Sequence, residues 1–147
     1  MRKFILILLV LMTATTAVAE TAWILCQPDS YVNVRTRASS RSEILGRCEC
    51  GDEIEVDGKT KNGFVHCINL PLERNEGWIS AGYVVYSQPE KLYELVTMES
   101  DGRVACRKTI NGQRRCWVKD GDMVKVFFRS EEWSVTDRGF IKTEYID

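Results

Sequence analysis

The stretch VNVRTRASSRSEILG, residues 32–46, begins as a strand, continues as a run of Arg, Thr and Ser, and ends with apolar residues again. At its start, Val32 and Val34 alternate with polar residues, which is the period of a strand with one buried face. The middle part, residues 36–43, has no apolar side chain larger than that of Ala38. The stretch therefore predicts two strands joined by a long polar loop.

The same order of features occurs twice along the chain. In the first half it runs VNVR (32–35), CGDEIEV (50–56), GFVHCI (63–68) and GWISAGYVV (77–85), and in the second VACR (104–107), DGDMVKV (120–126), EEWSVT (131–136) and RGFIKTEYI (138–146). Trp78 and Tyr83 match Phe140 and Tyr145 with the same spacing of five residues. This repetition predicts two copies of one unit, residues 20–88 and a divergent copy at 89–147.

Each copy has the pattern of short strands joined by turns. The pairs Gly51-Asp52, Asn111-Gly112 and Gly121-Asp122 supply turn residues between alternating segments. No stretch of about 12 residues carries an apolar stripe at helical spacing. We therefore expect an all-β protein.

The first 20 residues, MRKFILILLVLMTATTAVAE, have the layout of a secretory signal peptide. Arg2 and Lys3 precede an apolar run, and small residues precede a cleavage point after Ala19. The alternative, a membrane anchor, requires a longer apolar run of roughly 18–20 residues. We expect residues 1–19 to be removed, no membrane-spanning segment in the mature chain, and a secreted or periplasmic location.

All six cysteines follow the predicted cleavage point, and an even number of cysteines in an exported chain favours disulfides. Cys106 and Cys116 flank the Asn111-Gly112 turn, so they are expected to face each other on a hairpin and to form a bridge. The other four cysteines allow three pairings, and the alternation favours Cys48 with Cys67 and Cys26 with Cys50. Buried free thiols and a zinc site that includes His66 are the alternatives.

The charge balance and the titratable residues exclude several functions. Loss of residues 1–19 removes two of the 20 basic residues and none of the 21 acidic ones, which leaves a net charge of −3. Such a chain is not expected to bind nucleic acid. The one histidine, His66, is expected on the surface of a strand, and Cys67 beside it would face the opposite way, so the two cannot form a catalytic pair. We expect no enzyme activity and no cofactor.

The order NVR, polar loop, ILG, Gly-Asp turn and GWIS in the first copy resembles the bacterial SH3 (SH3b) domain over residues 24–86. The second copy resembles it less closely, with Phe140 in place of Trp78. The resemblance implies two small, partly open β-barrels in tandem, stabilised here by disulfides. It also implies an exported, non-catalytic module that binds peptidoglycan peptide or another cell-envelope component. The groove is expected to be lined by Tyr31, Asn33, Arg35, Glu76, Trp78 and Tyr83.

Two alternatives remain open for the polar loop and for the partner. The loop arginines could be solvated residues of a connector that the fold requires in any case. The second copy carries a basic cluster around its predicted bridge, which could bind an acidic secreted or periplasmic protein, or could be a solvated hairpin. The cluster consists of Arg103, Arg107, Lys108, Arg114 and Arg115. The alternative function is therefore a protein-interaction or inhibitor module.

Overall fold

The computed structural model describes residues 18–97 and 102–146, so the predicted signal peptide lies almost entirely outside the described residues. The described chain consists of strands and two short 3-10 turns, which confirms the all-β prediction. Within these two ranges no helix has the length and apolar character needed to cross a membrane.

Thirteen strands follow one another within residues 18–97 and 102–146. The first unit contains β1 (Glu20–Ile24), β2 (Tyr31–Arg35), β3 (Ile44–Glu49), β4 (Glu53–Lys61), β5 (Phe64–Ile68), β6 (Gly77–Ser80), the 3-10 turn η1 (Ala81–Tyr83) and β7 (Val84–Val85). The second contains β8 (Glu90–Thr97), β9 (Arg103–Arg107), β10 (Arg114–Lys119), β11 (Met123–Arg129), β12 (Trp133–Thr136), β13 (Gly139–Lys142) and η2 (Thr143–Tyr145). The predicted division after residue 88 falls between β7 and β8.

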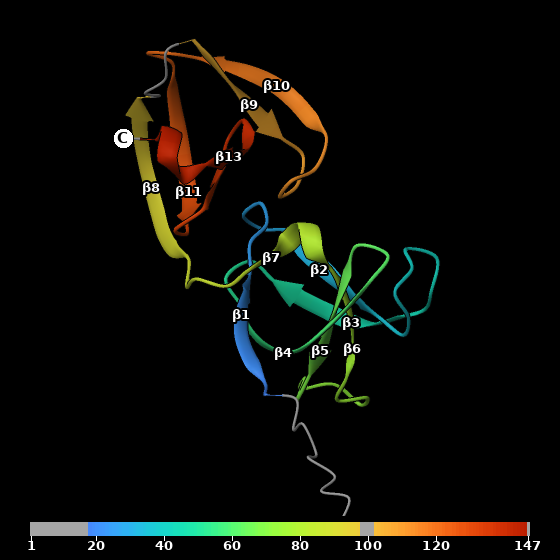
Figure 1. The fold of residues 1–147 in the computed structure, drawn as a ribbon. Coiled ribbons are helices and arrows are strands. Elements are labelled where there is room, and N and C mark those ends of the chain that lie inside the picture. Colours follow the sequence, from blue (N-terminus) through green and yellow to red (C-terminus); the bar gives the residue numbers. More distant parts are fainter. Residues whose placement is uncertain (1–17, 98–101, 147) are drawn as a thin grey trace, which may run out of the picture.

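The strands form two antiparallel sheets, one above the other in Figure 1. The first has the order β3-β2-β6-β5-β4-β1-β7 and the second the order β10-β9-β13-β12-β11-β8. Apart from β7 the two orders correspond strand for strand, and a 3-10 turn follows β6 and β13 alike. Two antiparallel sheets of this kind are consistent with SH3-like domains, whereas the tandem of barrels stays a prediction.

Each sheet has an arginine at the same position, and this arginine connects two strands to a loop. Arg35 pairs with Trp78, and Arg107 pairs with Phe140 at the corresponding point of the second sheet. Each arginine donates from Nη1 to a carbonyl oxygen of the loop that follows its strand, at 2.8 Å in both cases. The R of NVR and ACR therefore fixes the loop after the strand.

A glycine precedes the aromatic residue in both sheets because the backbone beside it is too close for a side chain. A Cβ added at Gly77 would lie 2.5 Å from Val34 and 3.1 Å from the carbonyl oxygen of Arg35. A Cβ added at Gly139 would lie 2.6 Å from the carbonyl oxygen of Arg107. These glycines allow β6 and β13 to approach the arginine strands.

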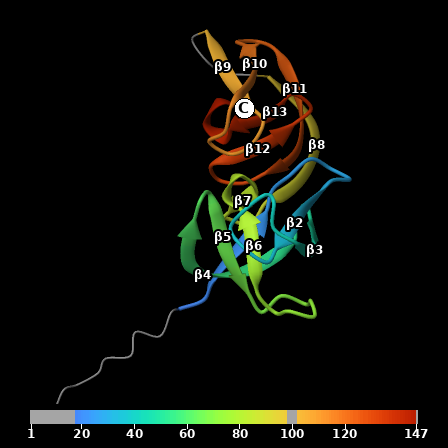
Figure 2. The same cartoon turned by 90° about the vertical axis from the view of Figure 1, so that its right-hand side faces the viewer.

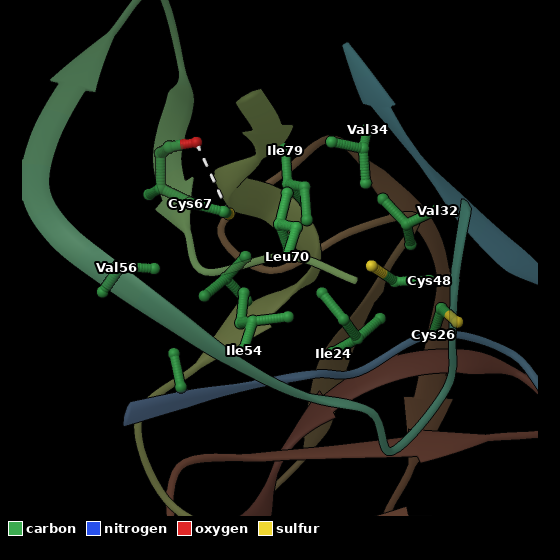
Figure 3. Close-up of a cluster of buried hydrophobic side chains, with 13 residues drawn as sticks. Ile24, Cys26, Val32, Val34, Cys48, Ile54, Val56, Cys67, Leu70 and Ile79 are labelled. Atoms are coloured by element: carbon green, nitrogen blue, oxygen red, sulfur yellow. Dashed lines mark hydrogen bonds between the residues drawn. The ribbon is translucent and has the colours of Figure 1, made fainter. Parts of the chain in front are cut away.

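Each sheet encloses its own apolar cluster. Figure 3 shows the one in the first sheet, where side chains from seven strands and their flanking segments meet. Its buried members are Ala22, Ile24, Cys26, Val32, Val34, Cys48, Ile54, Val56, Val65, Cys67, Leu70, Ile79 and Val84. The cluster in the second sheet consists of Val104, Cys106, Val118, Val124, Val126, Ile141 and Ile146. The valines of the alternating segments face inward, as their spacing predicts.

A third cluster lies between the sheets, which Figures 1 and 2 show in contact from both directions. Its buried members are Leu25, Val85, Phe128, Trp133, Val135 and Phe140. The amide of Ile110 donates to the carbonyl of Gly82 at 3.0 Å, and the side chain of Gln27 donates to the carbonyl of Thr136 at 3.2 Å. The two units are therefore packed through an apolar interface with hydrogen bonds beside it.

The six cysteines, all of them within the described residues, are free thiols, so the expected disulfides are absent from this structure. Cys106 and Cys116 nevertheless occupy directly opposed positions of β9 and β10. The Cys50 thiol accepts a hydrogen bond from the backbone amide of Cys26 at 2.9 Å and donates one to the Cys26 carbonyl at 2.6 Å. These two predicted pairs are thus adjacent without a bond.

The predicted pair Cys48–Cys67 is not bonded in this structure either, so it stays a prediction. The Cys67 thiol lies 3.9 Å from the carbonyl oxygen of Val65, and Cys48 and Cys67 belong to the same buried cluster in Figure 3. Both thiols lie in the apolar cluster, where burial raises the pKa of Cys48 to about 11 and that of Cys67 to about 12. They behave as buried free thiols, the alternative considered from the sequence.

Candidate functional site

The polar loop, residues 36–43, forms one wall of a cleft of about 530 Å³, which we call the loop cleft. The other walls come from the turn between β4 and β5 and from β6. The cleft is lined by Arg37, Ala38, Ser39, Arg41, Ser42, Lys61, Asn62 and Trp78. The predicted loop is therefore part of a cavity as well as a connector.

The loop is held in shape by Ser42, which is buried. The Ser42 hydroxyl lies 2.9 Å from the carbonyl oxygens of Arg37 and Ser39, and its backbone carbonyl accepts the bond from Arg35. Asn62 on the opposite turn donates to the carbonyl of Ala38 at 3.3 Å. These bonds place the loop residues at the cleft without any apolar core of their own.

Trp78 provides the aromatic surface of the cleft and rests on His66. The two ring centroids are 4.9 Å apart, with the planes at 52°. His66 Nδ1 lies 2.9 Å from Asp57 Oδ2, and His66 Nε2 lies 3.8 Å from Glu76 Oε2. A chain of polar contacts behind the indole thus fixes its position.

Asp57 anchors this chain. Its side chain is 7% exposed and also receives an ion pair from Lys59 at 2.8 Å. Burial by itself would raise the pKa of Asp57, but the hydrogen bonds from Lys59 and His66 outweigh it and lower that pKa to about 2. Asp57 is therefore a carboxylate at neutral pH and remains paired with His66.

The lining of the loop cleft is positively charged. Arg37, Arg41 and Lys61 contribute cations, and no carboxylate is among the lining residues of the described chain. An aromatic face beside guanidinium groups suits a ligand that combines apolar or amide surface with carboxylates. The cleft can therefore recognise a ligand, and it contains no pair of residues suited to acid–base or nucleophilic chemistry.

The six residues predicted to line one groove lie in several places. Trp78 lines the loop cleft, whereas Arg35 donates a hydrogen bond to the backbone of the loop. Glu76 lies 3.8 Å from His66 Nε2 and does not line the cleft. Asn33 lies on β2 with its Oδ1 buried and without a hydrogen-bond partner in the described chain. The structure therefore brings only part of this set together.

The two tyrosines of the prediction lie away from the loop cleft. Tyr31 carries Arg47 over its ring, 3.9 Å from the centroid, and lines a separate cavity of about 390 Å³ with Phe128 of the second unit. Tyr83 packs in the interface between the units. Neither tyrosine is therefore among the residues that line the loop cleft.

Sequence reasoning missed two contributions to the site. Lys61 and Asn62 belong to the Lys-Asn-Gly turn between β4 and β5, and the Asn-Gly signal could have located this turn beside the loop. The prediction that His66 lies on the surface is wrong, since the residue is 9% exposed. Strand alternation places His66 opposite the core, but Trp78 and Asp57 cover it there.

Comparison with known proteins gives limited matches. The solved structures of NlpC1 and NlpC2 from Trichomonas vaginalis are similar with TM-scores of 0.40 and 0.38 and 14% identity in each case. They cover 91% and 90% of this chain, and the chain covers 45% and 47% of theirs, about half their length. No curated protein matches the chain. The family model of the bacterial SH3 domain matches residues 30–85, which confirms the resemblance for the sheet that carries the loop cleft.

Proposed function

We propose that the protein is an exported, non-catalytic binding protein that attaches to the cell envelope through the loop cleft, with the peptide part of peptidoglycan as its ligand. The observation that carries this proposal is the cationic, Trp-bearing cleft within the segment that matches the bacterial SH3 domain. Bacterial SH3 domains bind cell-wall components, and the match over residues 30–85 supports a wall-related binding role. The particular ligand is our inference.

The charge of the loop cleft supports a peptide that carries carboxylates. Arg37 and Arg41 present guanidinium groups, which bind carboxylates in a bidentate manner, and Lys61 adds a third positive charge. Trp78 offers a flat apolar surface for the peptide chain between its charged groups. The cleft is thus complementary to a short anionic peptide.

The proposal also includes export of the protein and its organisation as two similar units. The signal-peptide pattern of residues 1–19 supports a secreted or periplasmic protein. The equal strand orders support two SH3-like units in tandem. In an oxidising compartment, two-electron oxidation by an external disulfide would link Cys106 to Cys116 and Cys26 to Cys50, since each pair is adjacent.

Sedimentation of the chain from Glu20 with purified peptidoglycan sacculi tests the proposal. We expect the unmodified chain to sediment with sacculi, and Trp78→Ala and the double variant Arg37→Glu, Arg41→Glu to remain in solution. Arg74→Glu, an exposed charge reversal elsewhere in the first unit, should sediment as the unmodified chain does. Equal sedimentation of the cleft variants, or no sedimentation of the unmodified chain, would overturn the proposal.

A further inference from the structure

The β9–β10 hairpin carries a concentrated positive charge. Residues 103–119 contain six basic residues and no acidic one. They are Arg103, Arg107, Lys108, Arg114, Arg115 and Lys119. Arg107 is used internally, because it holds the hairpin loop through the carbonyl of Gly112 at 2.8 Å. The other five are exposed, and no carboxylate of the described residues lies within ion-pair distance of them.

An exposed tryptophan lies at the centre of this charge. Trp117 is 41% exposed, and the guanidinium carbons of Arg103 and Arg114 lie 4.4 and 4.5 Å from the centroid of its ring. Trp117 pairs with Ala105 across the hairpin, so it lies on the face opposite the buried Val118. Stacking on the indole orders both guanidinium groups and leaves their N–H donors free for an acceptor.

Protection of the sheet edge explains only part of this arrangement. β10 is the last strand of its sheet, and charged side chains together with a bulge are common means of preventing edge pairing. The ladder is indeed irregular between Arg114 and Cys116. Edge protection needs neither an exposed indole nor two arginines ordered against it. The outward side chains therefore point to an acceptor outside the described chain.

We infer that the outer face of the β9–β10 hairpin is a docking surface for an acidic segment of another protein, whose carboxylates bind Arg103 and Arg114 around Trp117. Charge complementarity selects an anionic partner. The composition selects a protein, because Trp and Arg are the residues enriched in protein–protein binding centres, whereas Lys is depleted there. Four of the six cations are arginines. The inference goes beyond the proposed function, since this surface lies in the sheet that does not carry the loop cleft (Figure 1).

Fluorescence anisotropy with a labelled peptide of alternating Glu and Ser, and a Lys-Ser peptide as its opposite, tests the inference on the whole chain from Glu20. The acidic peptide should bind and should be released as the salt concentration rises. The double variant Arg103→Glu, Arg114→Glu should weaken binding at least about tenfold, and Trp117→Ala should weaken it less strongly. The control Arg74→Glu should change it by less than about twofold, because surface charges away from the contact contribute little.

Additional variants test whether a loss of peptide binding comes from the charges or from a damaged fold. The pair Arg103→Gln, Arg114→Gln removes the charges while keeping polar side chains of related length, and unchanged urea unfolding would show that the fold is intact. Because the loop cleft is itself complementary to anionic peptides, the same comparison is repeated in chains that carry Trp78→Ala, where Arg103→Glu, Arg114→Glu should still weaken peptide binding at least about tenfold. Equal binding by the charge-reversed variant would overturn the inference. So would binding to vesicles that contain phosphatidylglycerol without binding to the acidic peptide, which would indicate a membrane-binding surface.

Discussion

Tyr83 of the first unit packs edge-on against Phe140 of the second, with ring centroids 6.2 Å apart and the ring planes at 63°. By position in the repeat, Phe140 corresponds to Trp78, yet the two residues have different surroundings. Trp78 faces the loop cleft, whereas Phe140 is 1% exposed in the cluster between the sheets. The second unit therefore uses this position to hold the two units together, where the first uses it as the aromatic surface of a cleft.

Replacement of Phe140 tests this role. Phe140→Ala should lower the free energy of unfolding by about 3–5 kcal/mol, because a fully buried aromatic side chain is lost from the interface. Phe140→Leu should cost less, and Tyr86→Ala, at a residue that is 52% exposed, should cost little. Urea unfolding followed by tryptophan fluorescence measures all three. A loss below about 1 kcal/mol for the alanine variant would show that the interface adds little to stability.

The strands and turns could be predicted from the sequence because they depend on local patterns. The alternating valines and the Gly-Asp turns located β4 and β11, where Asp52 and Asp122 each accept a bond from a backbone amide three residues earlier. The repeat also predicts which arginines correspond, and Arg35 and Arg107 pair with residues at equivalent positions, Trp78 and Phe140. These features are set by neighbours along the chain or by direct strand pairing.

The site and the interface could not be predicted in the same way. Alternation predicts which face of a strand meets the core but not what covers the other face. It therefore predicts a solvent-exposed His66, whereas Trp78 and Asp57 bury this residue. Tyr83 was assigned to a groove because nothing in its own segment shows that the second unit packs on it. Lys61 joins the loop cleft through a contact between distant turns. Each error concerns a contact between segments far apart in sequence.

Ser42 offers a test of the loop that does not alter a charged residue of the cleft. Ser42→Ala removes the hydroxyl that bonds to Arg37 and Ser39, so the loop should lose its fixed shape. We expect the unfolding free energy to fall by about 1–3 kcal/mol and retention on sacculi to fall with it. Ser40→Ala, at an exposed position of the same loop, should leave both unchanged. Full retention by Ser42→Ala would show that the loop need not be ordered to bind.

Asp57 predicts a dependence of stability on acid. Because the pKa of Asp57 is lowered from its ordinary value of 3.8 to about 2, its contribution is fully present above about pH 4 and is lost as the pH falls toward 2. Asp57→Asn should therefore be less stable than the unmodified protein at neutral pH, and the difference should shrink over this window. Urea midpoints from pH 2 to 5 measure it, with the exposed Glu73→Gln as control. A difference that stays constant with pH would contradict the assigned ion pair.

The thiols predict which cysteines oxidise. Cys106 and Cys116 are opposed across the hairpin, and burial, followed by the hydrogen bond with Cys116, raises the pKa of Cys106 to about 12. The hydrogen bond between Cys26 and Cys50 raises the pKa of the first thiol and lowers that of the second, so Cys50 is expected to react first with an external disulfide.

Peptide mapping after mild oxidation and alkylation under denaturing conditions should therefore recover two cross-linked pairs, Cys26 with Cys50 and Cys106 with Cys116. Cys48 and Cys67 should be recovered alkylated, since their thiols are buried and burial raises the pKa of both. Serine at both Cys106 and Cys116 should lower the stability of the oxidised protein by roughly 2–3 kcal/mol, because the closed loop is short. As a control, the double variant and the unmodified protein are compared under reducing conditions. Most of the difference in unfolding free energy between them should then disappear. Recovery of a Cys48–Cys67 bridge would mean that the core of the first unit rearranges on oxidation.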